Sequence, residues 1–179
     1  MKIVAVNGSL VSGGNVYALL DHSLAGYDDR PDIEVTRFAL SRMEIGQCRH
    51  CNWCIKKQKQ GRYCAQEDDM VKVYPALIEA NGLIIATPVH FGRLSGATAD
   101  FIDRLRVFVH GKITGGAMRN KVGGALAVAW LRNAGIETAL ISVTAAFNEL
   151  GMASARSAAA RVAELAALME AGRVSLEAG

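Results

Sequence analysis

VAVNGSLVSGGNVY, residues 4–17, is the stretch that decides the fold, because signals for a strand, a turn and a helix follow one another in it without a gap. The β-branched, apolar run that ends at Val6 predicts a short buried strand, and apolar residues at helical spacing begin at Val16. The turn between them contains Gly8, Gly13 and Gly14, which let the backbone curl with its amides pointing inward. A turn of this kind at the start of a helix predicts a site for a phosphate group.

The side chains of this turn restrict the kind of phosphate. The spacing of its glycines does not fit the GxGxxG dinucleotide motif, and the turn lacks the Gly-Lys-Ser/Thr ending of a nucleotide triphosphate loop. With Ser9, Ser12 and Asn15 as donors and no lysine, it suits a phosphomonoester such as that of FMN better than a triphosphate with magnesium. A glycine-rich connection without a ligand is the other interpretation, because such turns are common in α/β proteins.

Strands and helices are expected to alternate along the rest of the chain. Apolar runs predict strands at residues 32–40, 83–87 and 122–129, and helical spacing predicts helices near 68–78, 95–108, 136–147 and 155–171. Asp68 and Ser95 are candidate helix caps, and we expect Pro75 to bend or restart its helix. The alternation predicts a doubly wound parallel sheet with helices on both faces, a three-layer α/β/α fold.

Three loops of this fold are expected to meet at one edge of the sheet. They are residues 7–15, 88–92 and 130–135, and each follows the carboxyl end of a predicted strand. Ligands of such sheets bind outside the carboxyl ends of the strands. The sequence therefore predicts a binding site formed by these loops.

Composition bounds the class of protein. A chain of 179 residues, 51% hydrophobic and 21% charged, can bury one core, so we expect a single domain over residues 1–179. A net charge of +3 with scattered basic residues indicates no nucleic-acid partner. The apolar runs are too short to cross a bilayer and the chain begins directly with a strand, so we expect no membrane association and a cytoplasmic location.

All four cysteines fall in one insertion, residues 47–66, with the spacing Cys48-x2-Cys51-x2-Cys54-x9-Cys64. Three thiolates two residues apart, with a fourth further along, are typical of a 4Fe-4S cluster. Zinc fits less naturally, because its sites usually use paired CxxC hooks, and disulfides are not expected in a cytoplasmic protein. Vacant or redox-active thiols remain an alternative.

These residues together resemble a known family. The motifs that carry the resemblance are Gly8-Ser9, Gly14-Asn15, the cysteines leading into residues 68–70, the TPVHFG run at 87–92 and Asp103-Arg104. With them the chain resembles the flavodoxin-fold NADPH-dependent FMN reductases, and most closely the iron-sulfur flavoproteins. The resemblance covers roughly residues 1–152. It implies FMN bound non-covalently, with its phosphate on the first loop and its ring against the second. It also implies homodimers or homotetramers that complete the flavin site.

The resemblance carries particular residues. It assigns the phosphate to the first loop, at Ser9, Ser12, Gly14, Asn15 and Val16. It assigns one face of the ring to the second loop, at Pro88, Val89, His90, Phe91 and Gly92. It assigns the far side of the ring to the third loop, at Trp130, Arg132, Asn133 and Gly135. Three departures stand out. Val16 replaces the usual threonine, His90 replaces the usual tyrosine, and no strand resembling the family's fifth follows Met152, so we expect the fifth edge strand to be missing.

The expected function is that of an FMN-dependent oxidoreductase. A cluster beside the flavin would couple it to one-electron partners, with NAD(P)H or ferredoxin as donor and a small molecule as acceptor. No catalytic side chain is assigned, because hydride transfer to a flavin needs none. The alternatives are an NAD(P)H-dependent FMN or quinone reductase without a cluster, an electron carrier that is not an enzyme, and a metal-binding scaffold that has lost flavin.

Overall fold

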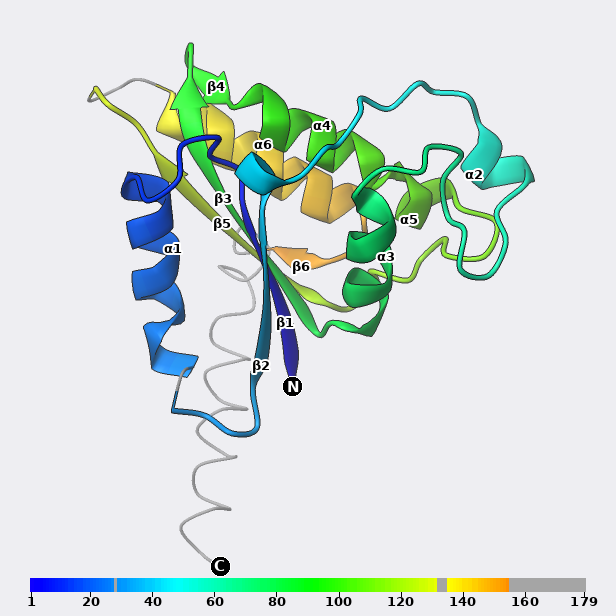
Figure 1. Ribbon diagram of the computed structural model, residues 1–179, viewed down its shortest axis with the longest axis horizontal. Coiled ribbons are helices and arrows are strands. Elements are labelled where there is room, and N and C mark those ends of the chain that lie inside the picture. The colour runs from blue at the N-terminus through cyan, green and yellow to red at the C-terminus, as the bar shows by residue number, and fades with distance from the viewer. Residues whose placement is uncertain (28, 132–134, 155–179) are drawn as a thin grey trace, which may run out of the picture.

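The computed structural model describes residues 1–27, 29–131 and 135–154. A parallel sheet runs through its centre (Figure 1). Its strands are β1 (Lys2–Asn7), β2 (Glu34–Ala39), β3 (Gly82–His90), β5 (Val122–Val128) and β6 (Ala153–Ser154), and β4 (Arg93–Leu94) is attached to β3. The helices are α1 (Asn15–Leu24), α2 (Trp53–Lys56), α3 (Met70–Glu79), α4 (Gly96–Arg104), α5 (Arg106–His110) and α6 (Ile136–Glu149), with 3-10 turns η1 (Ala25–Tyr27) and η2 (Leu40–Arg42).

The sheet has the order β2-β1-β3-β5-β6, with every neighbouring pair parallel. Strand β1 pairs Val4 with Thr36 of β2 on one side and with Leu83 of β3 on the other. The strand order changes direction between β1 and β3, because β2 lies on one side of β1, whereas β3, β5 and β6 lie on the other side. The carboxyl ends of β1, β3 and β5 therefore lie next to each other, as the sequence predicted.

The prediction that the fifth edge strand is missing is wrong where the structure describes the chain. Ala153 and Ser154 pair in parallel with Val122 and Gly123 of β5 and form the start of a fifth parallel strand. The described part of this strand is two residues long, which is too short to give a recognisable apolar alternation in the sequence. The predicted final helix at 155–171 lies outside the described residues.

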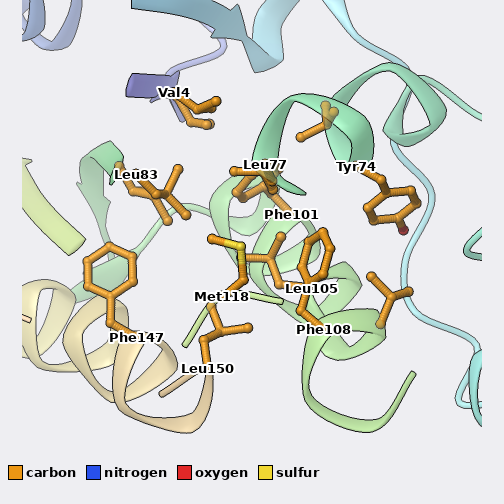
Figure 2. Packing of buried hydrophobic residues seen from close by; sticks show 14 of the residues in the cluster. Val4, Tyr74, Leu77, Leu83, Phe101, Leu105, Phe108, Met118, Phe147 and Leu150 are labelled. Atoms are coloured by element: carbon orange, nitrogen blue, oxygen red, sulfur yellow. The ribbon is translucent and has the colours of Figure 1, made fainter. Parts of the chain in front are cut away.

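Side chains alternate between the two faces of the sheet and form two cores. Val4 and Val6 face the larger core, where α3, α4, α5 and α6 pack, whereas Ala5 faces α1 (Figure 1). Figure 2 shows the larger core, with Leu83 of the sheet among side chains such as Leu77 of α3 and Phe147 of α6. Burial of these side chains, at roughly 1.5–3 kcal/mol each, holds the helices to the sheet. None of the helices in the described ranges is both long and apolar enough to span a bilayer.

Three local expectations differ from the structure. Pro75 does not restart its helix, because α3 runs unbroken over Met70–Glu79 with Pro75 exposed inside it. The third strand continues past Thr87 to His90, so the TPVHFG run is the end of a strand and a turn instead of an open loop. The helix that starts after Ser95 divides at Leu105 into α4 and α5.

Candidate functional site

The first loop joins β1 to α1 and has a fixed internal geometry. The amide of Ser9 donates to Asn7 Oδ1 at 2.9 Å, and Ser9 Oγ accepts from the amide of Val11 at 3.1 Å. Gly13 has a positive φ of 70°, which favours glycine. No side chain caps α1, whose N-cap is Gly14, so the amides of its first turn are left for another partner. The positive end of the helix dipole lies at the same place.

The predicted phosphate-binding residues of this loop play different parts. Ser12 and Asn15 are exposed beside the uncapped start of α1. Ser9 is buried and its hydroxyl is used within the loop, where it shapes the turn. Val16 is buried in the core beneath α1, so only its backbone faces the loop. Asn7 Nδ2 is buried and has no hydrogen-bond partner among the described residues.

A network of buried hydroxyls joins this loop to the second one. Ser95 Oγ donates to the carbonyl of Gly8 at 2.9 Å and lies 2.8 Å from Thr98 Oγ1, which donates to Thr87 Oγ1 at 3.0 Å. The amide of Gly8 donates to the carbonyl of Ala86 at 2.7 Å. A Cβ on Gly8 would lie 1.9 Å from Thr98 Oγ1, so only glycine fits there. The two loops are therefore fixed to each other through backbone and hydroxyl contacts.

The second loop is a hairpin that rises from the end of β3. Val89 pairs with Leu94 and His90 with Arg93, and Phe91 and Gly92 form the turn with φ of 52° and 76°. Pro88 and Val89 are partly buried, whereas His90, Phe91 and Gly92 are exposed. A left-handed phenylalanine is uncommon, and such backbone strain is found mainly at functional sites.

The third loop reaches the tip of this hairpin. Gly135 has a φ of 89°, and a Cβ on it would lie 2.3 Å from the carbonyl oxygen of Gly92. The backbones of the two loops are thus in direct contact. Trp130 lies at the start of the loop and is 94% exposed, and Arg132 and Asn133 lie outside the described residues.

The three loops carry large apolar side chains that the rest of the described chain does not cover. These side chains follow three neighbouring strands: Leu10 and Val11 after β1, Phe91 after β3, and Trp130 and Leu131 after β5. Apolar groups gathered at the edge of a sheet indicate a surface for a ligand or for a partner chain. Beside an uncapped helix start, they suit a ligand with an anionic end and a flat apolar ring.

The cysteine insertion lies beside α5 (Figure 1). Just after this helix, the amide of Lys112 donates to the carbonyl of Cys54 at 2.9 Å. Gln58 is buried and anchors the insertion, because its side chain bonds Thr114 Oγ1 at 2.7 Å and accepts from the amide of Ile113 at 2.7 Å. His50 and Asn52, between the first three cysteines, have φ of 49° and 57°. The guanidinium of Arg62 lies over the ring of Trp53, 5.3 Å from its centroid.

The four cysteines are free thiols: Cys54 is buried, Cys48 and Cys64 are partly buried and Cys51 is exposed. Burial raises the pKa of Cys54, Arg106 acts to lower it, and Cys64 and Cys48 are near enough to raise it further. Within the described ranges, no three His, Cys, Asp or Glu side chains converge as ligands of a metal ion. The structure thus places the cysteines on one segment without forming a ligand set.

Arg104 is the buried charge closest to this segment. Arg104 forms a two-bond pair with Asp68, which precedes α3. Burial acts to raise the pKa of Asp68, but the hydrogen bonds from Arg104 and from the amide of Gly46 outweigh it, so this pKa lies below its usual range. Sequence reasoning also missed the roles of Gly8, Thr87 and Thr98, because their contacts join segments far apart in the chain.

Solved structures with this arrangement of elements include several flavoproteins. RosB with bound 8-demethyl-8-formylriboflavin-5'-phosphate aligns with a TM-score of 0.67 at 21% identity, over 86% of this chain and 61% of that chain. An FMN-dependent NADH-azoreductase from Bacillus anthracis in complex with FMN aligns with a TM-score of 0.61 at 14% identity, over 88% of this chain and 89% of that chain. At these identities the likeness shows the fold, which is flavodoxin-like.

The sequence identifies the family within this fold. Residues 1–165 match the NADPH-dependent FMN reductases, and the chain belongs to that family, whose members are flavin-dependent oxidoreductases. An iron-sulfur flavoprotein of Methanocaldococcus jannaschii is 39% identical over 145 residues, 80% of this chain and 69% of that protein. One of Methanosarcina thermophila is 31% identical over 143 residues, 80% of this chain and 71% of that protein. This chain therefore spans about two thirds of the length of these relatives, and 61% of RosB.

Proposed function

We propose that this protein binds FMN at the three loops and passes electrons from a reduced donor to a small acceptor, with its four cysteines holding one 4Fe-4S cluster. The observation that carries the flavin part is the edge of the sheet itself. There an uncapped helix start lies in a loop that hydroxyls fix to the hairpin of the second loop, and exposed apolar side chains surround both. Family membership supports the same cofactor.

The residues of the site divide the work of binding. The amides at the start of α1, with the hydroxyl of Ser12 and the amide of Asn15, hold the phosphate by hydrogen bonds and by the helix dipole. The backbone of residues 88–92 supports one face of the ring, and Trp130 limits the access of water from the side of the third loop. FMN supplies the chemistry when bound, because it accepts two electrons together and releases them singly.

The donor set supports a cluster better than zinc. A single ion requires its sulfurs to converge on one point, whereas the thiolates around a cubane each bind a different iron and stay further apart. Cys48 and Cys64 lie near enough to Cys54 to raise its pKa, and the segment between the first three cysteines contains two left-handed residues, which supports the second arrangement. The relatives named iron-sulfur flavoproteins point the same way.

The proposed partners follow from the same surface. NAD(P)H or ferredoxin serves as the donor, and a small acceptor approaches the open face of the flavin. A second copy of the chain, in a homodimer or homotetramer, covers the apolar side chains of the three loops. We place no catalytic role on a side chain of this protein.

Anaerobic purification with metal analysis and visible spectroscopy tests the proposal. We expect flavin bands with a broad brown shoulder and about four irons per chain, as one cubane requires. Yellow protein without iron would replace the proposal by a cluster-free FMN reductase, and rapid bleaching by NADPH would separate that reductase from an electron carrier. Colourless protein that takes up neither flavin nor iron would overturn both.

A further inference from the structure

The two ends of the cysteine insertion meet at one guanidinium. Arg104, the last residue of α4, is 1% exposed. Its Nη1 donates to the carbonyl of Gly46 at 2.7 Å, just before the insertion, and its Nη2 donates to Cys64 Sγ at 3.5 Å, near its end. Both terminal nitrogens also donate to the carboxylate of Asp68.

The carboxylate of Asp68 also binds the backbone on both sides of the insertion. Its Oδ2 accepts from the amide of Gly46 at 3.0 Å, and its Oδ1 accepts from the amide of Met70 at 3.2 Å. A buried guanidinium needs one opposite charge and partners for its other donors. Here the charge comes from Asp68, and the other two partners are the carbonyl of Gly46, just before the insertion, and Cys64 Sγ within it, whereas the buried Nε has no hydrogen-bond partner among the described residues. The pair therefore holds the insertion closed at its base, in addition to joining α4 to α3.

The contact with sulfur distinguishes Arg104 from the other arginine beside the cysteines. Arg106 of α5 donates to Asn52 Oδ1 at 3.0 and 3.2 Å, so it holds the backbone between Cys51 and Cys54. Arg104 donates to the sulfur of the fourth predicted ligand. Its planar fork can satisfy a carboxylate, a carbonyl and a sulfur at once, whereas the single nitrogen of a lysine cannot do so in that geometry.

We propose that Arg104 is a positioning residue for Cys64. Its guanidinium fixes the Cys64 sulfur at the base of the insertion, and its N–H···S bond raises the reduction potential of whatever cluster that sulfur binds. The second part rests on the proposed function, whereas the first does not. Hydrogen bonds and positive charge next to a ligand sulfur favour the reduced cluster, because reduction adds negative charge to it.

The variant that tests this is Arg104→Lys, which keeps the charge opposite Asp68 but removes the fork. The matched control is Arg30→Lys, because Arg30 makes the same two-bond pair with Asp32, at 2.9 Å for each bond, on an exposed surface. A second variant, Arg104→Met with Asp68→Asn, removes both charges together in case the lysine variant does not fold.

Redox titration of the cluster is the first measurement. We expect Arg104→Lys to lower the midpoint potential by the equivalent of about tenfold in the oxidised-to-reduced ratio, the effect of one hydrogen bond to a charged group. The flavin spectrum should not change, and Arg30→Lys should match the wild type in both. A wild-type cluster potential in a folded Arg104→Lys protein would overturn the tuning role.

Hydrogen exchange of the metal-free protein is the second measurement and does not depend on a cluster. Both Arg104 variants should exchange faster over residues 46–66, with the first loop unchanged. If the wild-type protein holds no iron, the cluster part of the proposed function fails, and this exchange result decides the positioning role by itself. Unchanged exchange over 46–66 in a folded variant would refute that role.

Discussion

Gly8 joins the first loop to the second loop through both of its backbone polar groups. Its amide and carbonyl bond Ala86 and Ser95, and Thr98 occupies the space where a side chain would stand. Any Cβ must therefore push the first loop away from the second loop. The contacts of Gly8 therefore help to fix the position of the first loop relative to the hairpin.

Gly8→Ala is expected to destabilise the fold by about 1–3 kcal/mol through overpacking, and to weaken FMN binding at least about tenfold because the loop moves. Thermal unfolding and FMN titration measure the two effects. Gly26→Ala is the control, because a Cβ there has no atom within 4 Å and should change neither quantity. Full FMN affinity in Gly8→Ala would show that the loop position does not matter for binding.

Asp68 gives stability a dependence on acid. Its pKa is lowered in the folded protein, so its contribution to stability is present above the unfolded value of about 3.9 and is lost as pH falls through the folded value. We expect the wild-type unfolding temperature to fall below about pH 4. Asp68→Asn should be less stable at neutral pH and should fall less steeply in acid, and parallel acid curves for the two proteins would contradict this origin.

At the scale of elements, α3 contains a proline in its interior, a position that is usually unfavourable in a helix. Pro75 is exposed and follows five residues of the helix, so its ring removes the hydrogen bond to the carbonyl of Val71. The helix survives because Met70, Val73, Tyr74 and Leu77 are fully buried on the other side, and because Lys121 Nζ donates to the carbonyls of Leu77 and Ile78 at its end.

Pro75→Ala restores that hydrogen bond, so we expect it to raise the free energy of unfolding by roughly 1–3 kcal/mol. Chemical denaturation measures the change, and FMN affinity should stay constant because Pro75 lies inside α3 and in none of the three loops. A less stable variant would mean that the proline ring packs favourably on its surroundings.

The elements also show what can be predicted from the sequence. Ser95 caps α4 by accepting from the amide of Thr98 at 3.2 Å, as its local pattern indicated. Arg104 pairs with Asp68, which is 36 residues away, and no local spacing reveals such a pair. The strand β6 was missed because its two described residues carry no pattern.

At the scale of the whole molecule, the parallel sheet brings together loops that are separate in the sequence. Alternation of strands and helices was enough to predict this edge, because the fold places the carboxyl ends of β1, β3 and β5 side by side. The hydroxyl network of Thr87, Ser95 and Thr98 was not predictable, because it depends on how closely those loops pack. The strand order determines that the three loops meet at this edge, and side-chain packing determines how firmly they are held together.

The central claim is that the uncapped start of α1 holds the phosphate of a flavin. Titration of the flavin-free protein with FMN and with riboflavin, followed by fluorescence, tests it most directly, because riboflavin has the same ring and no phosphate. We expect saturation at one FMN per chain and binding of riboflavin at least about 100-fold weaker, the cost of losing two or more charge-assisted hydrogen bonds. Equal affinity for the two flavins, or no binding of FMN, would contradict the account.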